Sequence, residues 1–326
     1  MLDQMLDEYD IIELITKRAG RLPEGYLPIG DDVAMIPQGE PGEQVVLKCD
    51  MLVGKSDVPP GMTWERASRK AVAMCVSDFG SKGVRPVAFM VSLGVPKPTE
   101  GKVAQLASGL AQASHEWGVR LVGGDTSEAD DLIIDCIMVG FANDVVKRSG
   151  ARPGQLVVTT GPFGRTTAGL RILIDRAKAE ASFKKEALSS VYHPNPRLRV
   201  GLEISGCLSS AMDSSDGLAI CLHTIARMSG VGIRVRELPY AEGLGEFASR
   251  NGYSAEELAL YGGEEYEIVG TMDRSRLAEA ERKAKREGCD LRVIGETVPT
   301  TILKGVAFND GRKIRRDGWI HFRSKP

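Results

Sequence analysis

Val119-Arg120-Leu121-Val122-Gly123-Gly124-Asp125-Thr126 is the segment from which the organisation of this chain can be worked out. Val119–Val122 is mostly apolar and β-branched, which predicts a strand. The glycine pair that follows allows another backbone or a ligand to approach closely. The carboxyl group of Asp125 comes directly after the predicted strand, so we expect the strand to deliver an acidic side chain to a functional site.

Other acidic segments resemble this arrangement: four place an acid beside Gly, Ser or a second acid, and in the fifth a predicted strand at 45–49 ends at Asp50. They are Gly30-Asp31-Asp32, Cys49-Asp50, Ser77-Asp78, Asp213-Ser214-Ser215-Asp216 and Gly262-Gly263-Glu264-Glu265. Acidic residues are normally spread over solvated surfaces, and a single one at such a position is usually a turn or cap residue. If they gather, each like-charged pair ~4 Å apart costs about 4 kcal/mol at an effective dielectric of ~20, so the group needs cations.

Carboxylate oxygens are the ligands that Mg²⁺ prefers, and Mg²⁺ keeps waters and substrate phosphates in its remaining positions. The sequence therefore predicts a magnesium–phosphate site. Its candidate metal ligands are Asp32, Asp50, Asp78, Asp125, Asp213 and Asp216.

The length of 326 residues suits two domains. The Gly- and Pro-containing segment Ser149–Gly154 predicts a boundary between residues 1–148 and 149–326. In the first part, a long helix opened by Thr63 should reach Lys82, and strands alternate with helices, which indicates an α/β class. The strands at 87–95 and 132–141 are apolar enough that we expect both of their faces to be buried.

Composition excludes several classes of protein. A net charge of −2 and a pI near 6.2 give no support for a nucleic-acid or membrane-surface partner. No apolar run reaches the ~20 residues of a membrane helix, and the acidic start of the chain is unlike a signal peptide. The six cysteines are scattered without a Cys-x-x-Cys pair, so we expect buried free thiols and a cytoplasmic protein.

Two short motifs carry less weight. Gly54-Lys55-Ser56 matches the end of a P-loop, but Cys49 stands where the first glycine is required and a proline pair follows, so a P-loop is rejected. Gly161-x-x-Gly164 could hold a phosphate, although a tight strand-to-helix turn is the favoured interpretation. The four histidines have no metal-ligand spacing and no acyl-transfer set is present.

The acidic segments, in their order, also carry a family resemblance. Together with Arg148–Gly154 and Gly318-Trp319-Ile320-His321-Phe322, they resemble the thiamine-monophosphate kinases, a family of the aminoimidazole-ribotide synthetase and selenophosphate synthetase superfamily. The resemblance implies an N-terminal α/β domain that pairs with its twin to close a β-barrel, and a C-terminal α+β domain. It also implies a homodimer that uses ATP and Mg²⁺ to phosphorylate thiamine monophosphate in thiamine diphosphate biosynthesis.

Position by position, the resemblance implies that the six aspartates named above bind Mg²⁺. It implies ATP contacts at Gly124, Asp125, Arg148 and Ser215, and substrate contacts at Glu264 (pyrimidine) and Trp319 (stacking). Asp57 stands where many members have a histidine that faces the substrate. Lys48-Cys49 replaces hydroxyl residues and Glu265 replaces a common Asp, so the resemblance is to a divergent member of the family.

No catalytic base is expected. The acceptor is a phosphate monoester with a second pKa of about 6, so its attacking oxygen is already anionic at neutral pH. Two alternatives remain open at this point. One is another ATP-using enzyme of the superfamily, similar to aminoimidazole-ribotide synthetase, and the other is a non-catalytic nucleotide- or metal-binding protein.

Overall fold

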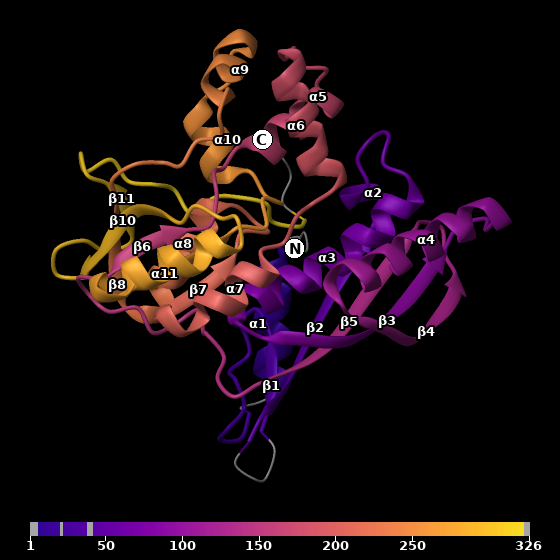
Figure 1. The fold of residues 1–326 in the computed structure, drawn as a ribbon, viewed down its shortest axis with the longest axis horizontal. Coiled ribbons are helices and arrows are strands. Elements are labelled where there is room, and N and C mark those ends of the chain that lie inside the picture. Colours follow the sequence, from indigo (N-terminus) through magenta and orange to yellow (C-terminus); the bar gives the residue numbers. More distant parts are fainter. Residues whose placement is uncertain (1–5, 20–21, 38–41, 323–326) are drawn as a thin grey trace, which may run out of the picture.

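The computed structural model of the chain describes residues 6–19, 22–37 and 42–322. Figure 1 shows two β-sheets side by side, with the long helix α3 (Trp64–Lys82) at the junction between them. Because α3 contacts strands of both sheets, it is the element that fixes one half of the molecule against the other.

The first sheet has five strands in the order β1-β2-β5-β3-β4. Only the β3–β4 pair is parallel, and the other pairs are antiparallel. The strands are β1 (Ala34–Ile36), β2 (Gln44–Val53), β3 (Arg85–Val95), β4 (Arg120–Glu128) and β5 (Ile133–Ala142). The accompanying helices are α1 (Glu8–Ala19), α2 (Gly54–Asp57), α3 and α4 (Glu100–Trp117).

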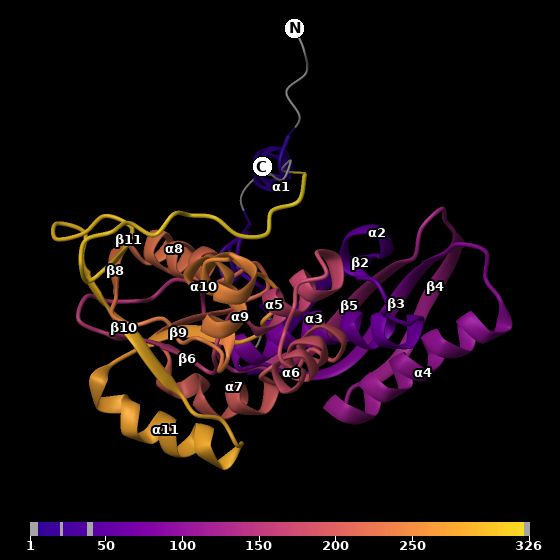
Figure 2. The same ribbon diagram turned by 90° about the horizontal axis from the view of Figure 1, so that it is seen from above.

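The second sheet has six strands in the order β11-β8-β10-β6-β9-β7. The strands are β6 (Leu156–Thr159), β7 (Ser210–Asp213), β8 (Val231–Val235), β9 (Ile268–Met272), β10 (Arg292–Pro299) and β11 (Val306–Phe308). Helix α8 packs on one face and α11 lies on the other, as Figure 2 shows. The helices are α5 (Arg165–Ile174), α6 (Ala181–Tyr192), α7 (Leu198–Ile204), α8 (Leu218–Ser229), α9 (Leu244–Asn251), α10 (Ala255–Tyr261) and α11 (Leu277–Arg286), with short 3₁₀ turns at Ser205–Cys207 and Arg274–Arg276. The mixed α/β class expected from the sequence is confirmed, with α+β packing in this second half.

The boundaries of α3 follow the sequence signals. The Thr63 side chain accepts a hydrogen bond from the amide of Arg66, and Gly83 ends the helix in the left-handed conformation (φ 68°). Near its end, a side chain on Gly201 of α7 would come within 1.9 Å of the Gly80 carbonyl oxygen. The missing Cβ therefore allows α3 and α7 to cross closely, which brings the end of α3 against the second sheet.

Three expectations about the first sheet are wrong. Asp50 lies inside β2 rather than at its end, and Gly123–Thr126 lies inside β4 rather than in a turn after it. The strands near 87–95 and 132–141 are buried on one face only. The sheet is open within the described residues, so a closed barrel is not formed by one chain.

The face of this sheet opposite α3 carries exposed apolar side chains. Met51, Met90 and Phe141 are 54%, 42% and 36% exposed, and the strand registers place them on the side away from the buried core. Elsewhere the cysteines are free thiols, five of them buried as expected, whereas Cys49 is exposed. Among the described helices, none has the length and apolar character needed to cross a bilayer.

Candidate active site

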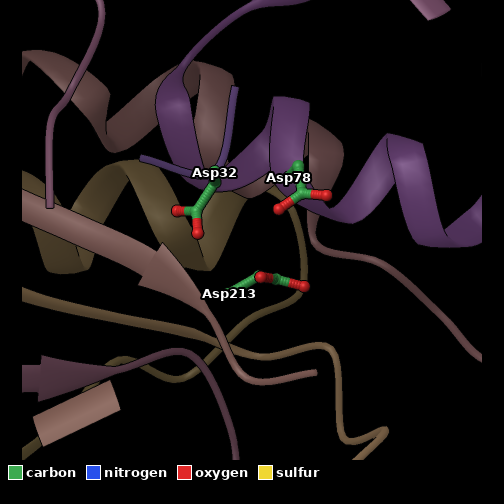
Figure 3. A group of neighbouring side chains, drawn as sticks. All are labelled: Asp32, Asp78 and Asp213. Carbon is green, nitrogen blue, oxygen red and sulfur yellow. The ribbon is translucent and has the colours of Figure 1, made fainter. Parts of the chain in front are cut away.

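Three of the predicted metal ligands meet at the junction of the two sheets. Asp32 comes from the turn before β1, Asp78 from α3 and Asp213 from the last position of β7. Each offers a carboxylate oxygen, and these oxygens lie within 4.8 Å of one another in buried positions. Figure 3 shows the three carboxyl groups pointing toward a common centre. Residues distant in sequence thus form one acidic cluster, which we call the Asp triad (Asp32, Asp78, Asp213).

The electrostatics of the Asp triad reflect buried charges in close proximity. Burial, together with the charge of Asp32, raises the pKa of Asp213 to about 6. Burial and the charges of Asp213 and Asp50 also raise the pKa of Asp78 well above its usual value, although Lys48 acts in the opposite direction. Burial opposes ionisation of Asp32 as well, but Lys82 and Arg148 lower its pKa. The triad therefore favours binding of additional positive charge.

Two basic side chains neutralise the Asp32 side of the cluster. The Lys82 Nζ atom lies 2.5 Å from Asp32 Oδ2 and 2.9 Å from Asp31 Oδ1, and its side chain is fully buried. Arg148 donates from Nε to Asp32 Oδ1 at 2.5 Å and from Nη1 to the Gly30 carbonyl at 2.9 Å. Arg148, predicted to contact ATP, is therefore fixed at the edge of the triad by the Gly30–Asp32 turn.

Asp50 joins the cluster through a lysine. Lys48 Nζ lies 2.8 Å from Asp78 Oδ2 and 3.1 Å from Asp50 Oδ1. On the other side of the triad, Ser77 donates a hydrogen bond to Asp213 Oδ2 at 2.8 Å. Four of the six predicted metal ligands are thus within one connected network.

Asp125 does not reach this network. Asp50 pairs in register with Cys136 of β5, and Cys136 faces the buried core. On β4, the residue before Asp125 is Gly124, which pairs with the buried Val91 of β3. Because side chains alternate along a strand, Asp125 lies on the opposite face of the sheet. Packing alone requires glycine at position 124, because an added Cβ would lie 2.1 Å from the Val91 carbonyl oxygen.

The remaining predicted positions form a second group beside the triad. The amide of Glu264 donates to the Ser215 carbonyl at 2.7 Å, and the amide of Trp319 donates to the Asp216 carbonyl at 3.0 Å. Burial and the charges of Glu8 and Asp213 raise the pKa of Asp216 to about 7. Trp319 remains 37% exposed next to this loop. Ser215, Asp216, Glu264 and Trp319 therefore lie close together, although they come from three distant segments.

Lys70 connects this second group to α3 and to the end of α2. Its almost fully buried side chain donates to Glu264 Oε1 at 2.5 Å and to the Asp57 carbonyl at 2.9 Å. Glu264 has a positive φ of 63°, an unusual conformation that these contacts help to hold. The Asp57 carboxylate instead accepts from the amide of Val53 at 2.7 Å, so it stabilises its own turn.

A polar pocket of about 270 Å³ opens beside Glu264. It is lined by residues of α5, α6 and the segment after α6, including Arg165, His193 and Arg197. Two further acids in its wall are already engaged: Glu265 accepts from the amides of Gly164 and Thr166, and Glu267 forms a two-point ion pair with Arg197. Glu264, from the same segment, is held by Lys70 and also lines this pocket.

Lys70 and Lys82 are site residues that the sequence motifs do not reveal. Together with Ser77 and Asp78 they lie on the side of α3 that contacts the second half of the molecule. Their signal was the spacing of Lys70, Asp78 and Lys82, 8 and 4 residues apart, which places the three charged groups on neighbouring positions of one side of the helix. Lys48 stands out in the sequence only as a departure from the family pattern.

The donors present fit Mg²⁺. The Asp triad supplies three carboxylate oxygens in one buried place, from a donor set of oxygen alone. Burial and neighbouring carboxylates raise the pKa of Asp78 and Asp213, so an added positive charge would stabilise their ionised forms. Asp50 borders the same space through Lys48. Asp216 follows Asp213 by three residues at the rim.

Comparisons with known proteins identify relatives of both halves of this chain. The model of the AIR synthase related protein N-terminal domain matches residues 30–142, and the model of the C-terminal domain matches residues 152–307. A solved structure of AaThiL complexed with AMPPCP and TMP superimposes with a TM-score of 0.86 at 27% identity, covering 99% of this chain and 100% of that one. Thiamine monophosphate kinase from Aquifex aeolicus gives a TM-score of 0.79 at 26% identity, covering 93% and 97% of the two chains.

Sequence relatives extend along nearly the entire chain. Thiamine-monophosphate kinase from Nitrosopumilus maritimus is 34% identical, covering 98% of this chain and 99% of its own length. The enzyme of the same name from Pyrococcus abyssi is 35% identical, covering 96% of this chain and 95% of its own. On this evidence, the chain belongs to the thiamine-monophosphate kinase family.

Proposed function

We infer that this chain is a kinase that transfers the γ-phosphoryl group of ATP to the phosphate of thiamine monophosphate, forming thiamine diphosphate and ADP. The observation that carries the inference is the Asp triad, in which three distant segments bring buried carboxylates together next to Glu264 and Trp319. The family relatives and a related structure with AMPPCP and TMP support the same reaction.

The arrangement suits a transfer between two anions. The acceptor phosphate needs no base, because its attacking oxygen is already anionic near neutral pH. When bound, Mg²⁺ would neutralise the phosphates of both substrates. Asp32, Asp78, Asp213 and Asp50 would hold the ions, with Asp216 at the rim. Arg148 is oriented by Asp32 and the Gly30 carbonyl toward the same space, where its charge offsets that of ATP.

We propose that Glu264 and Trp319 bind the thiamine portion. The Glu264 carboxylate, held by Lys70, would accept hydrogen bonds from the pyrimidine, while the exposed indole of Trp319 offers a stacking surface. Ser215 would contact ATP from the neighbouring turn. Asp57 takes part indirectly, because its carboxylate is bound to the Val53 amide and its carbonyl to Lys70.

We also propose that two chains form a homodimer through the open face of the first sheet, closing a barrel. The exposed Met51, Met90 and Phe141 support this, since a large apolar surface on a sheet usually marks an interface. Gly124 and Asp125 lie on β4 at the edge of this sheet, and Asp125 points away from the triad of its own chain. In the dimer, Asp125 would serve the site of the partner. Domains at residues 1–148 and 149–326 and a cytoplasmic location complete the proposal.

The central experiment measures ATP turnover and thiamine diphosphate formation with and without thiamine monophosphate and Mg²⁺. We expect both products only when all components are present. Asp213→Asn should reduce turnover by orders of magnitude while the circular dichroism spectrum is kept. Asp290→Asn, whose side chain is 74% exposed, is the matched control. ATP turnover that ignores thiamine monophosphate would favour another enzyme of the superfamily, and no turnover would favour a binding protein.

The shared site is tested by mixing two inactive variants. Asp125→Asn and Asp213→Asn should each be inactive alone, yet a refolded equimolar mixture should recover up to about a quarter of the wild-type activity, because half of the dimers then carry one intact site. A mixture as inactive as its components would refute the contribution of Asp125 across the dimer.

A further inference from the structure

Lys48 occupies an unusual position in the acidic cluster. It lies within β2, and its side chain is only 19% exposed. The register of β2 with β5 pairs it with Met138, which is fully buried, so the lysine side chain enters the face of the sheet that carries the core. The charge of a lysine at such a mostly buried position must be compensated inside the protein.

The compensation comes from two predicted metal ligands. Lys48 Nζ lies 3.1 Å from Asp50 Oδ1 and 2.8 Å from Asp78 Oδ2, which places the ammonium between these two oxygens. A Mg²⁺ ion that bridged the same oxygens would need them at about 2.0–2.1 Å. The ammonium group and a bridging ion therefore compete for one space.

The net charge of the cluster also depends on Lys48. The acidic side chains are Asp31, Asp32, Asp50, Asp78, Asp213 and Asp216, and the basic ones that contact them are Lys48, Lys82 and Arg148. With all nine groups ionised, the formal charge is −3. Without Lys48 it would be −4, so the lysine reduces the positive charge that ions must supply.

We propose that Lys48 is a fixed cation of the phosphoryl-transfer site, which takes the place of a divalent ion between Asp50 and Asp78. The chain would then bind one divalent ion fewer in this cluster than the same site without the lysine. Lys48 is a positioning residue, because it acts on substrates through the two aspartates. The inference rests on the proposed magnesium cluster but not on the identity of the phosphate acceptor.

The first test counts bound ions. Wild type, Lys48→Met and Lys184→Met are each dialysed to equilibrium against Mn²⁺ with a non-hydrolysable ATP analogue, and bound Mn²⁺ is measured by atomic absorption. Methionine keeps the length of the side chain and removes its charge, and Lys184 is an exposed lysine of α6. We expect one additional Mn²⁺ per chain in Lys48→Met alone. Equal counts in the three proteins would overturn the proposal.

The second test needs no variant and stands even if Lys48→Met does not fold. Crystals of the wild-type protein with Mn²⁺ and the same ATP analogue should show, in anomalous difference maps, no ion that bridges Asp50 and Asp78, with the Lys48 ammonium still between them. An ion bridging both carboxylates, with Lys48 displaced, would refute the assignment. Neither readout depends on thiamine diphosphate formation, so the proposed reaction can fail while this inference survives, and the reverse.

Discussion

Replacing Lys82 by methionine should reveal how much the junction depends on one buried charge. The Lys82 ammonium lies 2.9 Å from Asp31 Oδ1, 2.5 Å from Asp32 Oδ2 and 2.6 Å from the Ala211 carbonyl of β7. The side chains of both aspartates are at most 3% exposed. Methionine keeps a similar volume, so the change removes a charge rather than creating a cavity.

The magnitude follows from the charge left behind. Removing one partner of a buried ion pair costs about 3–5 kcal/mol, because the remaining charge stays buried. Arg148 still contacts Asp32, which brings the expected loss in free energy of unfolding toward the lower end, about 3 kcal/mol. Every 1.4 kcal/mol is roughly a tenfold change, so the folded-to-unfolded ratio should fall about a hundredfold.

The assay is equilibrium urea unfolding of the metal-free protein, followed by circular dichroism, with Lys184→Met as the matched control. A second variant, Lys82→Met with Asp31→Asn, removes one of the two stranded carboxylates and should recover part of the lost stability. If Lys82→Met lies within about 1 kcal/mol of wild type, or if the double variant is less stable than the single one, the charge argument is refuted.

Two further predictions concern the loop around Glu264. Burial raises the pKa of Glu265 to about 7, so the folded protein keeps a proton that the unfolded chain releases near its usual value of 4.5. The free energy of unfolding should therefore fall as pH rises from about 4.5 to about 7. Between pH 5 and 8, Glu265→Gln should lose less stability than wild type or than the exposed control Glu281→Gln. Equal losses in the three proteins would contradict this. Lys70→Met should raise the KM for thiamine monophosphate about tenfold or more, with little change in the KM for ATP. The reason is that a lost hydrogen bond to a charged group costs about 1.5–3 kcal/mol. An unchanged KM for thiamine monophosphate in steady-state assays would show that Lys70 does not position Glu264.

Local signals were sufficient for most elements. The threonine cap and the glycine stop predicted α3 because both act on the backbone within one turn of the helix. Helix α4 has the same kind of ends, with a side-chain cap at Thr99 and a left-handed Gly118. The sequence misplaced Asp50 and Gly123–Thr126, which lie inside strands. There, pairing with neighbouring strands overrides the local preference of Gly and Asp for turns.

The sequence by itself determined the class of fold, the family and the acidic segments that supply the site, because hydrophobic periodicity and motif order are properties of the chain alone. Only the tertiary structure decided which acids meet. It brought Asp32, Asp78 and Asp213 within reach of one another, put Asp125 on the other face of its sheet, and inserted Lys48 and Lys82 among the carboxylates. Convergence depends on strand register and on the crossing of α3 with α7, and these are set by packing between segments that are far apart in sequence.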